Sequence, residues 1–235
     1  MCCVTNRTPH VDADEIFGFG VWKSGFKNFG TSAEIICASA FDGRRIVKST
    51  QNVRISYLLP LMVNAVHWSR SKPKLFDECQ KMWKDNSDFV KIKPIPCAPV
   101  VVARVICRIL SCMVADEKVA GDDAGVLSAA KGETSDCFIS GYFSILRLLK
   151  QLSLEHPEIV QFADSSWKTF VEVKESRLKT LYPNIGEMLP LLCITSPAID
   201  WNYVKRAYVE ESSLRNVMWY ASLNSSLSPL NFHPF

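Results

Sequence analysis

The amino-acid sequence predicts an α+β fold that is mainly α-helical: a small N-terminal portion that contains a β-hairpin, followed by a multi-helix body. Two observations carry this prediction. Apolar residues recur at three- and four-residue steps through much of residues 135–221, which is the spacing of one helix face. The two-residue turn Asp42-Gly43 separates two short apolar runs and indicates a hairpin. A hydrophobic content of 48% and a charged content of 22% are ordinary for a globular chain of 235 residues.

Three segments are expected along the chain. Residues 1–15 are polar and should form a flexible tail. Residues 16–99 should form a mixed β/α portion, and residues 100–235 a helical body; these two can equally form one continuous globular domain. The boundary is placed at the end of KIKPIPCAP, residues 91–99, because closely spaced prolines favour an extended chain over a helix.

Residues 16–30, IFGFGVWKSGFKNFG, combine glycines with aromatic residues. Their glycine spacing approaches that of a phosphate-binding loop, but Lys23 stands where the dinucleotide motif needs its third glycine. We therefore expect an irregular or β segment whose aromatic side chains pack on the core, and no bound cofactor. Further on, residues 35–41 should form the first strand of the hairpin, and residues 44–47 the returning strand.

Residues 55–70 begin as an apolar run that Pro60 interrupts. Past this proline, a short helix is expected around Trp68, and a second helix should begin at Pro73. Residues 100–117 should form a buried helix, since apolar residues dominate it. The glycine-rich residues 118–134 should form a flexible surface loop.

Four helices are expected in the rest of the chain. The first runs from about Ser135 to His156, because the residue before a proline avoids the helical region. The second begins at Pro157, a short apolar helix covers residues 184–193, and Asp200 caps the last helix. The core side of the last helix should carry Trp201, Val204, Tyr208, Leu214, Val217, Met218 and Ala221, and its wet side Glu210, Glu211 and Arg215.

The nine cysteines show no spacing typical of a disulfide framework, so most should be reduced and many buried. Cys137 is the best candidate for a catalytic nucleophile, because it lies close to the start of an expected helix, where the helix dipole favours the thiolate. Cys79 follows two acidic residues, which should raise the pKa of its thiol. A cysteine-dependent hydrolase or transferase is therefore the alternative function, in which one thiol reacts much faster than the others.

No metal site is expected, because the four histidines are scattered and no two cysteines form a C-x-x-C pair. Cys107 and Cys112 also miss the short spacing of structural zinc sites. Adjacent Cys2 and Cys3 could accept palmitate, but Arg7 is the only basic residue close by, so lipidation is not expected. No apolar run is long enough to span a membrane.

The N-terminal half of the chain is basic. Residues 1–118 carry 17 Lys or Arg against 11 Asp or Glu, whereas residues 119–235 carry 10 against 13. Lysines in the basic half recur near Trp68, Phe76 and Trp83, a pattern that can bind phosphates and stack bases. Acidic residues among these lysines cancel much of the charge. Binding to nucleic acid or to an anionic surface is therefore the weaker alternative function.

These exclusions favour a non-catalytic protein-interaction or structural domain over an enzyme. With reduced cysteines and no recognisable export signal, we expect an intracellular, cytoplasmic protein whose partner is another protein. Helical bodies present grooves and faces for such contacts. The six tryptophans suit either a core or interface anchors, and the sequence leaves both uses open.

Overall fold

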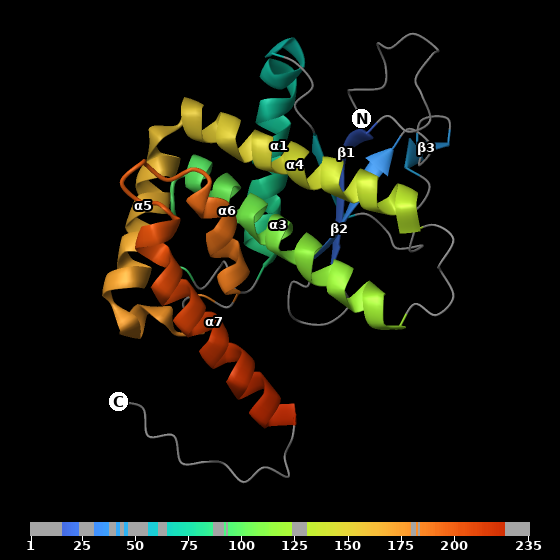
Figure 1. Ribbon diagram of the computed structural model, residues 1–235. Helices are drawn as coiled ribbons and strands as arrows, with labels where there is room; N and C mark the ends of the chain where they lie inside the picture. The colour runs from blue at the N-terminus through green and yellow to red at the C-terminus, as the bar shows by residue number, and fades with distance from the viewer. Residues whose placement is uncertain are drawn as a thin grey trace.

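The computed structural model describes residues 16–23, 31–37, 41–42, 45–46, 56–60, 65–86, 92, 94–123, 131–179, 182 and 184–223. It confirms the predicted fold class: strands occupy the N-terminal part, and helices make up most of the rest (Figure 1). The tail predicted for residues 1–15, with Cys2 and Cys3, lies outside the described residues.

Three strands form an antiparallel sheet in the order β2-β1-β5. The strands are β1 (Ile16–Lys23), β2 (Thr31–Cys37) and β5 (Tyr57–Pro60). Phe19 of β1 pairs with Leu59 of β5, and both side chains are buried. A Cβ atom on Gly18 would lie 2.6 Å from the carbonyl oxygen of Leu59, so the close approach of the two strands requires glycine there. Gly18 and Gly20 thus belong to a strand, as the structural interpretation of residues 16–30 predicted.

A second, two-stranded ribbon joins β3 (Phe41–Asp42) to β4 (Arg45–Ile46). This ribbon confirms the predicted hairpin, but not the position of its turn. Asp42 belongs to β3 and pairs with Arg45, so residues 43–44, not Asp42-Gly43, separate the two strands. The expected first strand was too long, however. Residues 35–37 belong to β2 and pair with β1, because Ile35 lies opposite the buried Phe19 and extends the larger sheet.

Helix α1 is continuous through Pro73, so the two short helices predicted there are one. A proline inside a helix removes one hydrogen bond and costs roughly 3 kcal/mol. After Pro73, the side chains of Leu75, Cys79 and Met82 are completely buried. The free energy gained by burying them offsets the cost of the proline.

The predicted surface loop over residues 118–134 is also wrong at both ends. Helix α3 continues to Asp123, and α4 begins at Lys131. Gly121 costs only about 1 kcal/mol relative to alanine inside a helix. That penalty is too small to stop a helix whose first half is already packed, since adding further residues is far easier than nucleation.

The remaining helices follow the predicted order. The bounds are α1 (Ala65–Asp85), α3 (Ala98–Asp123), α4 (Lys131–Glu155), α5 (Pro157–Glu172), η2 (Lys174–Arg177), η3 (Ile185–Glu187), α6 (Met188–Leu192) and α7 (Trp201–Leu223). Pro157 opens α5 as expected, and the Asp200 carboxylate accepts the backbone N–H of Tyr203 at 2.9 Å, which confirms the predicted cap of α7.

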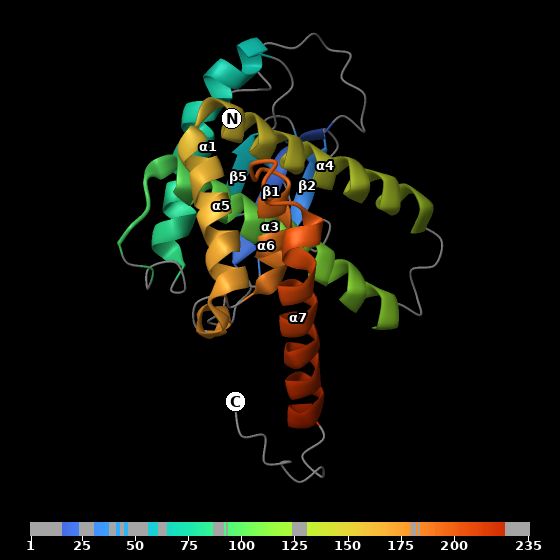
Figure 2. The ribbon, with the colours of Figure 1, turned by 60° about the vertical axis from the view of Figure 1, so that its left-hand side comes forward.

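Helix α3 lies at the centre of the molecule and contacts α1, α4, α5, α6 and the sheet (Figures 1 and 2). Its residues Val105, Ile106 and Ile109 are completely buried. They share one hydrophobic cluster with Phe19 and Leu59 of the sheet, so both predicted portions contribute to the same core. The division of the chain at residue 99 stays a prediction.

Glu155, the last residue of α4, joins that helix to α1. Its carboxylate accepts the indole N–H of Trp68 at 2.7 Å and the ammonium group of Lys72 at 2.6 Å. Burial acts to raise the pKa of this carboxyl, but hydrogen bonds from Gln151, Lys72 and Trp68 outweigh it and lower the pKa from 4.5 to about 2. The carboxylate therefore stays ionised, and the contact persists, far into the acid range.

Candidate interaction surface

The C-terminal half of α7 stands clear of the helical body (Figures 1 and 2). In its first half, Val204 and Ala207 are buried, and the helix packs against α5. In its second half the large apolar side chains are between 54% and 65% exposed. We call this set the α7 apolar surface; it consists of Leu214, Val217, Met218, Trp219 and Tyr220.

This exposure corrects the predicted faces of α7. Five residues expected on its core side are exposed instead: Trp201, Leu214, Val217, Met218 and Ala221. Arg215 was expected on the wet side but is half-buried against the body. The periodic pattern identifies which residues share a face, but it does not show how far the body extends along the helix. Beyond Arg215 the large apolar side chains are exposed.

The α7 apolar surface surrounds the helix axis. Successive residues of an α-helix are about 100° apart, so the four consecutive side chains from Val217 to Tyr220 cover roughly 300°. No charged residue occurs from Asn216 to Leu223. A helix that is apolar on every side is normally buried, and exposed apolar patches of this kind mark contact sites.

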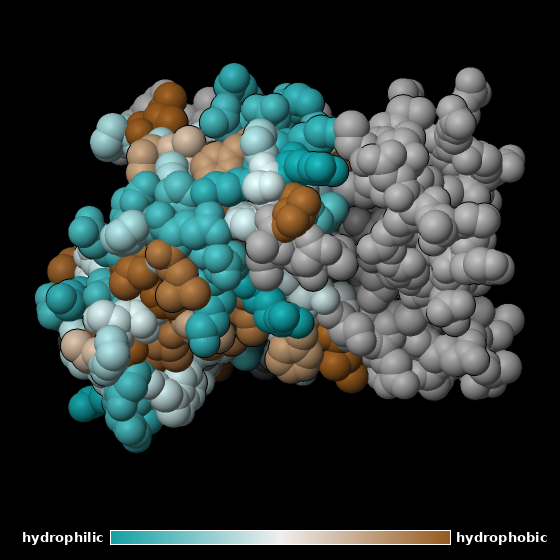
Figure 3. All heavy atoms as spheres, turned by 90° about the horizontal axis from the view of Figure 1, so that it is seen from above, coloured by the Kyte–Doolittle hydropathy of each residue, from teal (hydrophilic) through white to brown (hydrophobic). Residues whose placement is uncertain are grey.

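Exposed apolar residues elsewhere are more scattered. Figure 3 shows the molecule of Figure 1 from above, and on that face apolar areas are separated by hydrophilic ones. Isolated exposed apolar side chains are normal on protein surfaces. The continuous set at the end of α7 is therefore the more informative feature.

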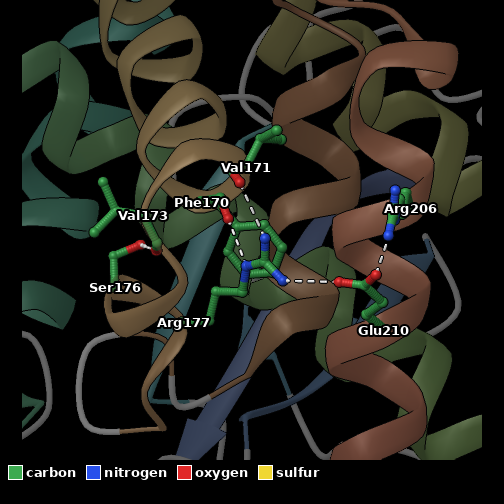
Figure 4. Close-up of polar contacts among 7 residues, drawn as sticks. All are labelled: Phe170, Val171, Val173, Ser176, Arg177, Arg206 and Glu210. Carbon is green, nitrogen blue, oxygen red and sulfur yellow. Dashed lines mark hydrogen bonds and ion pairs between the residues drawn. The ribbon is translucent and has the colours of Figure 1, made fainter. Parts of the chain in front are cut away.

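Arg177 of η2 joins the end of α5 to the middle of α7 (Figure 4). Its guanidinium donates to the carbonyl oxygens of Phe170 at 2.7 Å and Val171 at 3.0 Å, which lie in the last turn of α5. It also reaches the Glu210 carboxylate of α7 at 3.4 Å. The buried arginine thus satisfies two carbonyl groups that the end of α5 leaves without a helical partner, and it ties α5 to α7.

Arg215 supplies a second anchor just before the α7 apolar surface. Its guanidinium donates to the carbonyl oxygens of Tyr182 at 2.7 Å and Arg177 at 2.8 Å, and to the Glu211 carboxylate at 2.6 Å. The sequence showed only the Glu211–Arg215 pair, because its i,i+4 spacing is local; the two carbonyl contacts are formed by tertiary packing. For Arg177, nothing in the neighbouring sequence indicated that its side chain would be a buried contact.

The structure separates the cysteines by burial. Cys79 and Cys107 are buried, and burial, followed by the charges of Glu78 and Glu187 respectively, raises the pKa of their thiols. Burial also raises the pKa of the partly exposed Cys193 thiol. A raised pKa lowers the thiolate population at neutral pH, so these three sites are poorly suited to nucleophilic chemistry.

Cys137, the predicted candidate nucleophile, lies in α4, and its side chain is outside the described part of the chain. Since α4 begins at Lys131, Cys137 lies beyond the first turn, where the dipole effect has largely decayed. The argument that favoured Cys137 therefore no longer applies, although its reactivity stays a prediction. Within the described residues, no three His, Cys, Asp or Glu side chains are arranged to hold a metal ion.

The basic and aromatic residues of α1 do not form the predicted nucleic-acid pattern. Trp68 and Trp83 are buried and cannot stack on bases. Lys72 pairs with Glu155 at 2.6 Å, and Lys81 pairs with Glu78 at the same distance. The aromatic residues stabilise the core, and part of the positive charge is already neutralised.

Comparisons with protein-family models, with curated proteins and with solved structures find no significant match to this chain. A search of the described helices for one long and apolar enough to cross a membrane finds none. The α7 apolar surface is therefore argued from its own geometry and chemistry.

Proposed function

We propose that this chain is a non-catalytic protein-interaction domain that inserts the end of α7 into an apolar groove of a partner protein. The observation that carries the proposal is a projecting, uncharged helix end with large apolar side chains on every side. Tryptophan, tyrosine and methionine are enriched at protein interfaces, and tryptophan and tyrosine among the residues that contribute most to binding. Helix-in-groove binding uses an apolar helix of this kind.

The available area favours a groove over pairing with a second copy. Five side chains that are a little over half exposed offer roughly 500 Å² for burial. Two such helix ends lying side by side would bury only the facing side of each, and so would fall much further below the roughly 800 Å² per partner of a standard interface than the full area does. A groove that encloses the helix end can use nearly all of this area.

An intracellular location is part of the proposal. Its support is the unpatterned set of nine cysteines, of which Cys79, Cys97, Cys107, Cys112 and Cys193 are free thiols in the structure. The alternative function, a cysteine-dependent hydrolase or transferase, is less well supported, because burial raises the pKa of the thiols at Cys79, Cys107 and Cys193.

Site-specific photo-crosslinking in cells tests the proposal. A photoreactive phenylalanine analogue replaces Trp219 in one variant and Val66, an exposed apolar residue of α1, in the control. We expect a discrete heterologous crosslink from position 219 that disappears when Met218→Glu is added, and no such product from position 66. The identified partner should then bind the purified chain directly, and Met218→Glu should weaken that binding at least tenfold.

Three outcomes would contradict the groove proposal. A crosslink between two copies of the chain, together with a dimer in sedimentation analysis, would identify a second copy as the occupant. Crosslinking to lipid would identify a membrane surface. Equal crosslinking from positions 219 and 66 would show that the α7 apolar surface has no special role.

A further inference from the structure

Arg104 lies in the interior of α3, where α1 and α5 pack against that helix. Its guanidinium carbon is 5.7 Å from the ring centre of Trp83 in α1 and 5.5 Å from that of Phe162 in α5. Both distances are within the range of a cation–π contact. Trp83 is buried, whereas Arg104 and Phe162 are half-buried.

Within the described residues, Arg104 and its neighbour Arg108 differ in their partners. Arg108 lies one turn further along α3 and forms a buried ion pair with Glu187 of η3. Arg104, in contrast, makes no ion pair or hydrogen bond with any residue in the part of the chain that the structure describes. Among the described residues, the positive charge of Arg104 therefore has no carboxylate paired with it.

Burial lowers the pKa of the Arg104 guanidinium, while the charge of Glu187 acts in the opposite direction. Arginine nevertheless stays protonated in proteins, so its five N–H donors persist at neutral pH. Leaving such donors without acceptors in a partly desolvated place is costly. An oxygen ligand would remove that cost.

Tyr182 adds a further donor. Burial raises the pKa of its hydroxyl, while the positive charge of Arg104 acts in the opposite direction, and the hydroxyl stays protonated at neutral pH. Its ring is fixed by an edge contact with Phe170 at 5.7 Å between ring centres. Within the described residues, this hydroxyl forms no hydrogen bond.

We propose that Arg104 is the centre of a binding site for a carboxylate, which the guanidinium would receive through two parallel hydrogen bonds while Trp83 and Phe162 provide apolar contacts. The planar guanidinium matches the geometry of a carboxylate. The single positive charge of Arg104 matches a monoanion. A phosphate group carries more negative charge at neutral pH and would be repelled more strongly by Glu187.

Nuclear magnetic resonance of the arginine side chains tests this site directly. The Nε–Hε signals are followed while benzoate, acetate or inorganic phosphate is added to the ¹⁵N-labelled full chain at constant ionic strength and pH. Arg104→Lys assigns the signal of interest, and the signal of Arg206, which is 89% exposed, is the internal control. We expect benzoate to shift the Arg104 signal to saturation and to leave the Arg206 signal unchanged.

Two variants measure the contributions of the site. Arg104→Lys retains the charge but loses the planar pair of donors, so benzoate binding, followed by calorimetry, should weaken at least tenfold. Phe162→Leu removes one aromatic contact and should weaken binding several-fold. The wild-type titration decides the proposal even if a variant fails to fold.

Two short peptides distinguish the sources of the carboxylate. One has blocked ends and an internal glutamate, and the other has a free C-terminal carboxylate and no acidic side chain. Stronger binding of either peptide than of benzoate assigns the site to that part of a polypeptide, whereas stronger binding of benzoate assigns it to a small organic acid. Non-saturating shifts shared with Arg206, or phosphate binding as strong as benzoate binding, would overturn the proposal.

Discussion

Replacing Arg177 by methionine should destabilise the fold and weaken the packing of α7 against α5. Methionine retains an unbranched apolar stem of similar length, so the packing around the side chain is largely preserved. The substitution removes the donors to the carbonyl oxygens of Phe170 and Val171, and it removes the contact with Glu210 (Figure 4).

The size of the effect follows from the two carbonyl contacts. Hydrogen bonds to a charged donor contribute roughly 1.5–3 kcal/mol each. Arg177 is 7% exposed, so burying its charge has a cost that methionine avoids, and this offsets part of the loss. The Glu210 contact is long and exposed and contributes little. We expect a net loss of about 2–4 kcal/mol, which lowers the melting temperature by roughly 5–15 °C in a chain of this size.

Thermal unfolding and urea unfolding, both followed by circular dichroism, measure this loss. Arg206→Met is the matched control, because Arg206 donates to the same Glu210 carboxylate at 3.0 Å but is exposed. Its melting temperature should stay within about 1 °C of the unsubstituted chain. Equal effects of the two substitutions, or an unchanged midpoint for Arg177→Met, would refute the assignment of Arg177 as the buried anchor.

Three further predictions concern other parts of the fold. The pKa of Glu155 is lowered from 4.5 to about 2, so its contribution to stability is complete above pH 4.5 and is lost as the pH falls toward 2. The urea midpoint of the unsubstituted chain should therefore fall over this pH range, and the midpoint of Glu155→Gln should fall much less. Gly18→Ala places a Cβ atom 2.6 Å from the Leu59 carbonyl oxygen and should cost roughly 1–3 kcal/mol in urea unfolding, whereas no loss would show that β1 and β5 separate easily. Alkylation followed by mass spectrometry should label exposed Cys97 quickly and buried Cys107 only on unfolding; a single thiol that reacts far faster than Cys97 would revive the enzyme alternative.

Local signals in the sequence were sufficient for several elements of the fold. Pro157 at the start of α5 and Asp200 at the start of α7 act through residues within one turn, so a short window of sequence contains the whole interaction. The hairpin of β3 and β4 was predictable for the same reason, with its turn misplaced by one residue because Asp42 pairs with Arg45. Pro73 was misinterpreted because burial of Leu75 and its neighbours, which depends on the rest of the fold, outweighs the local penalty.

The candidate sites were mostly not predictable. Leu214 and Met218 share a face with buried residues, and the sequence does not show where the helical body ends. Arg177 acts on carbonyl groups that become available only because α5 ends at Glu172. For Arg104 a weak signal did exist: it interrupts the apolar run of α3 four residues before Arg108, so two cations occupy one side of a buried helix.

The shape of the α7 apolar surface leads to a last prediction about how its partner binds. Two helices that pair side by side use one face each, so only residues at three- and four-residue steps, such as Leu214 and Met218, contribute to binding. An enclosing groove contacts Val217, Met218, Trp219 and Tyr220 alike, although these four point in different directions.

Single alanine substitutions at these four positions, measured by calorimetry against the crosslinked partner, distinguish the two arrangements. If the groove encloses the helix end, each substitution should weaken binding by about 1 kcal/mol or more, and Trp219→Ala by the most, because it removes the largest side chain. Val66→Ala on α1 should leave the affinity unchanged. Should Met218→Ala alone matter while Trp219→Ala and Tyr220→Ala bind normally, the partner contacts one face only. That result would contradict the enclosing groove, and the apolar side chains on the other faces of the helix would then have no role in binding this partner.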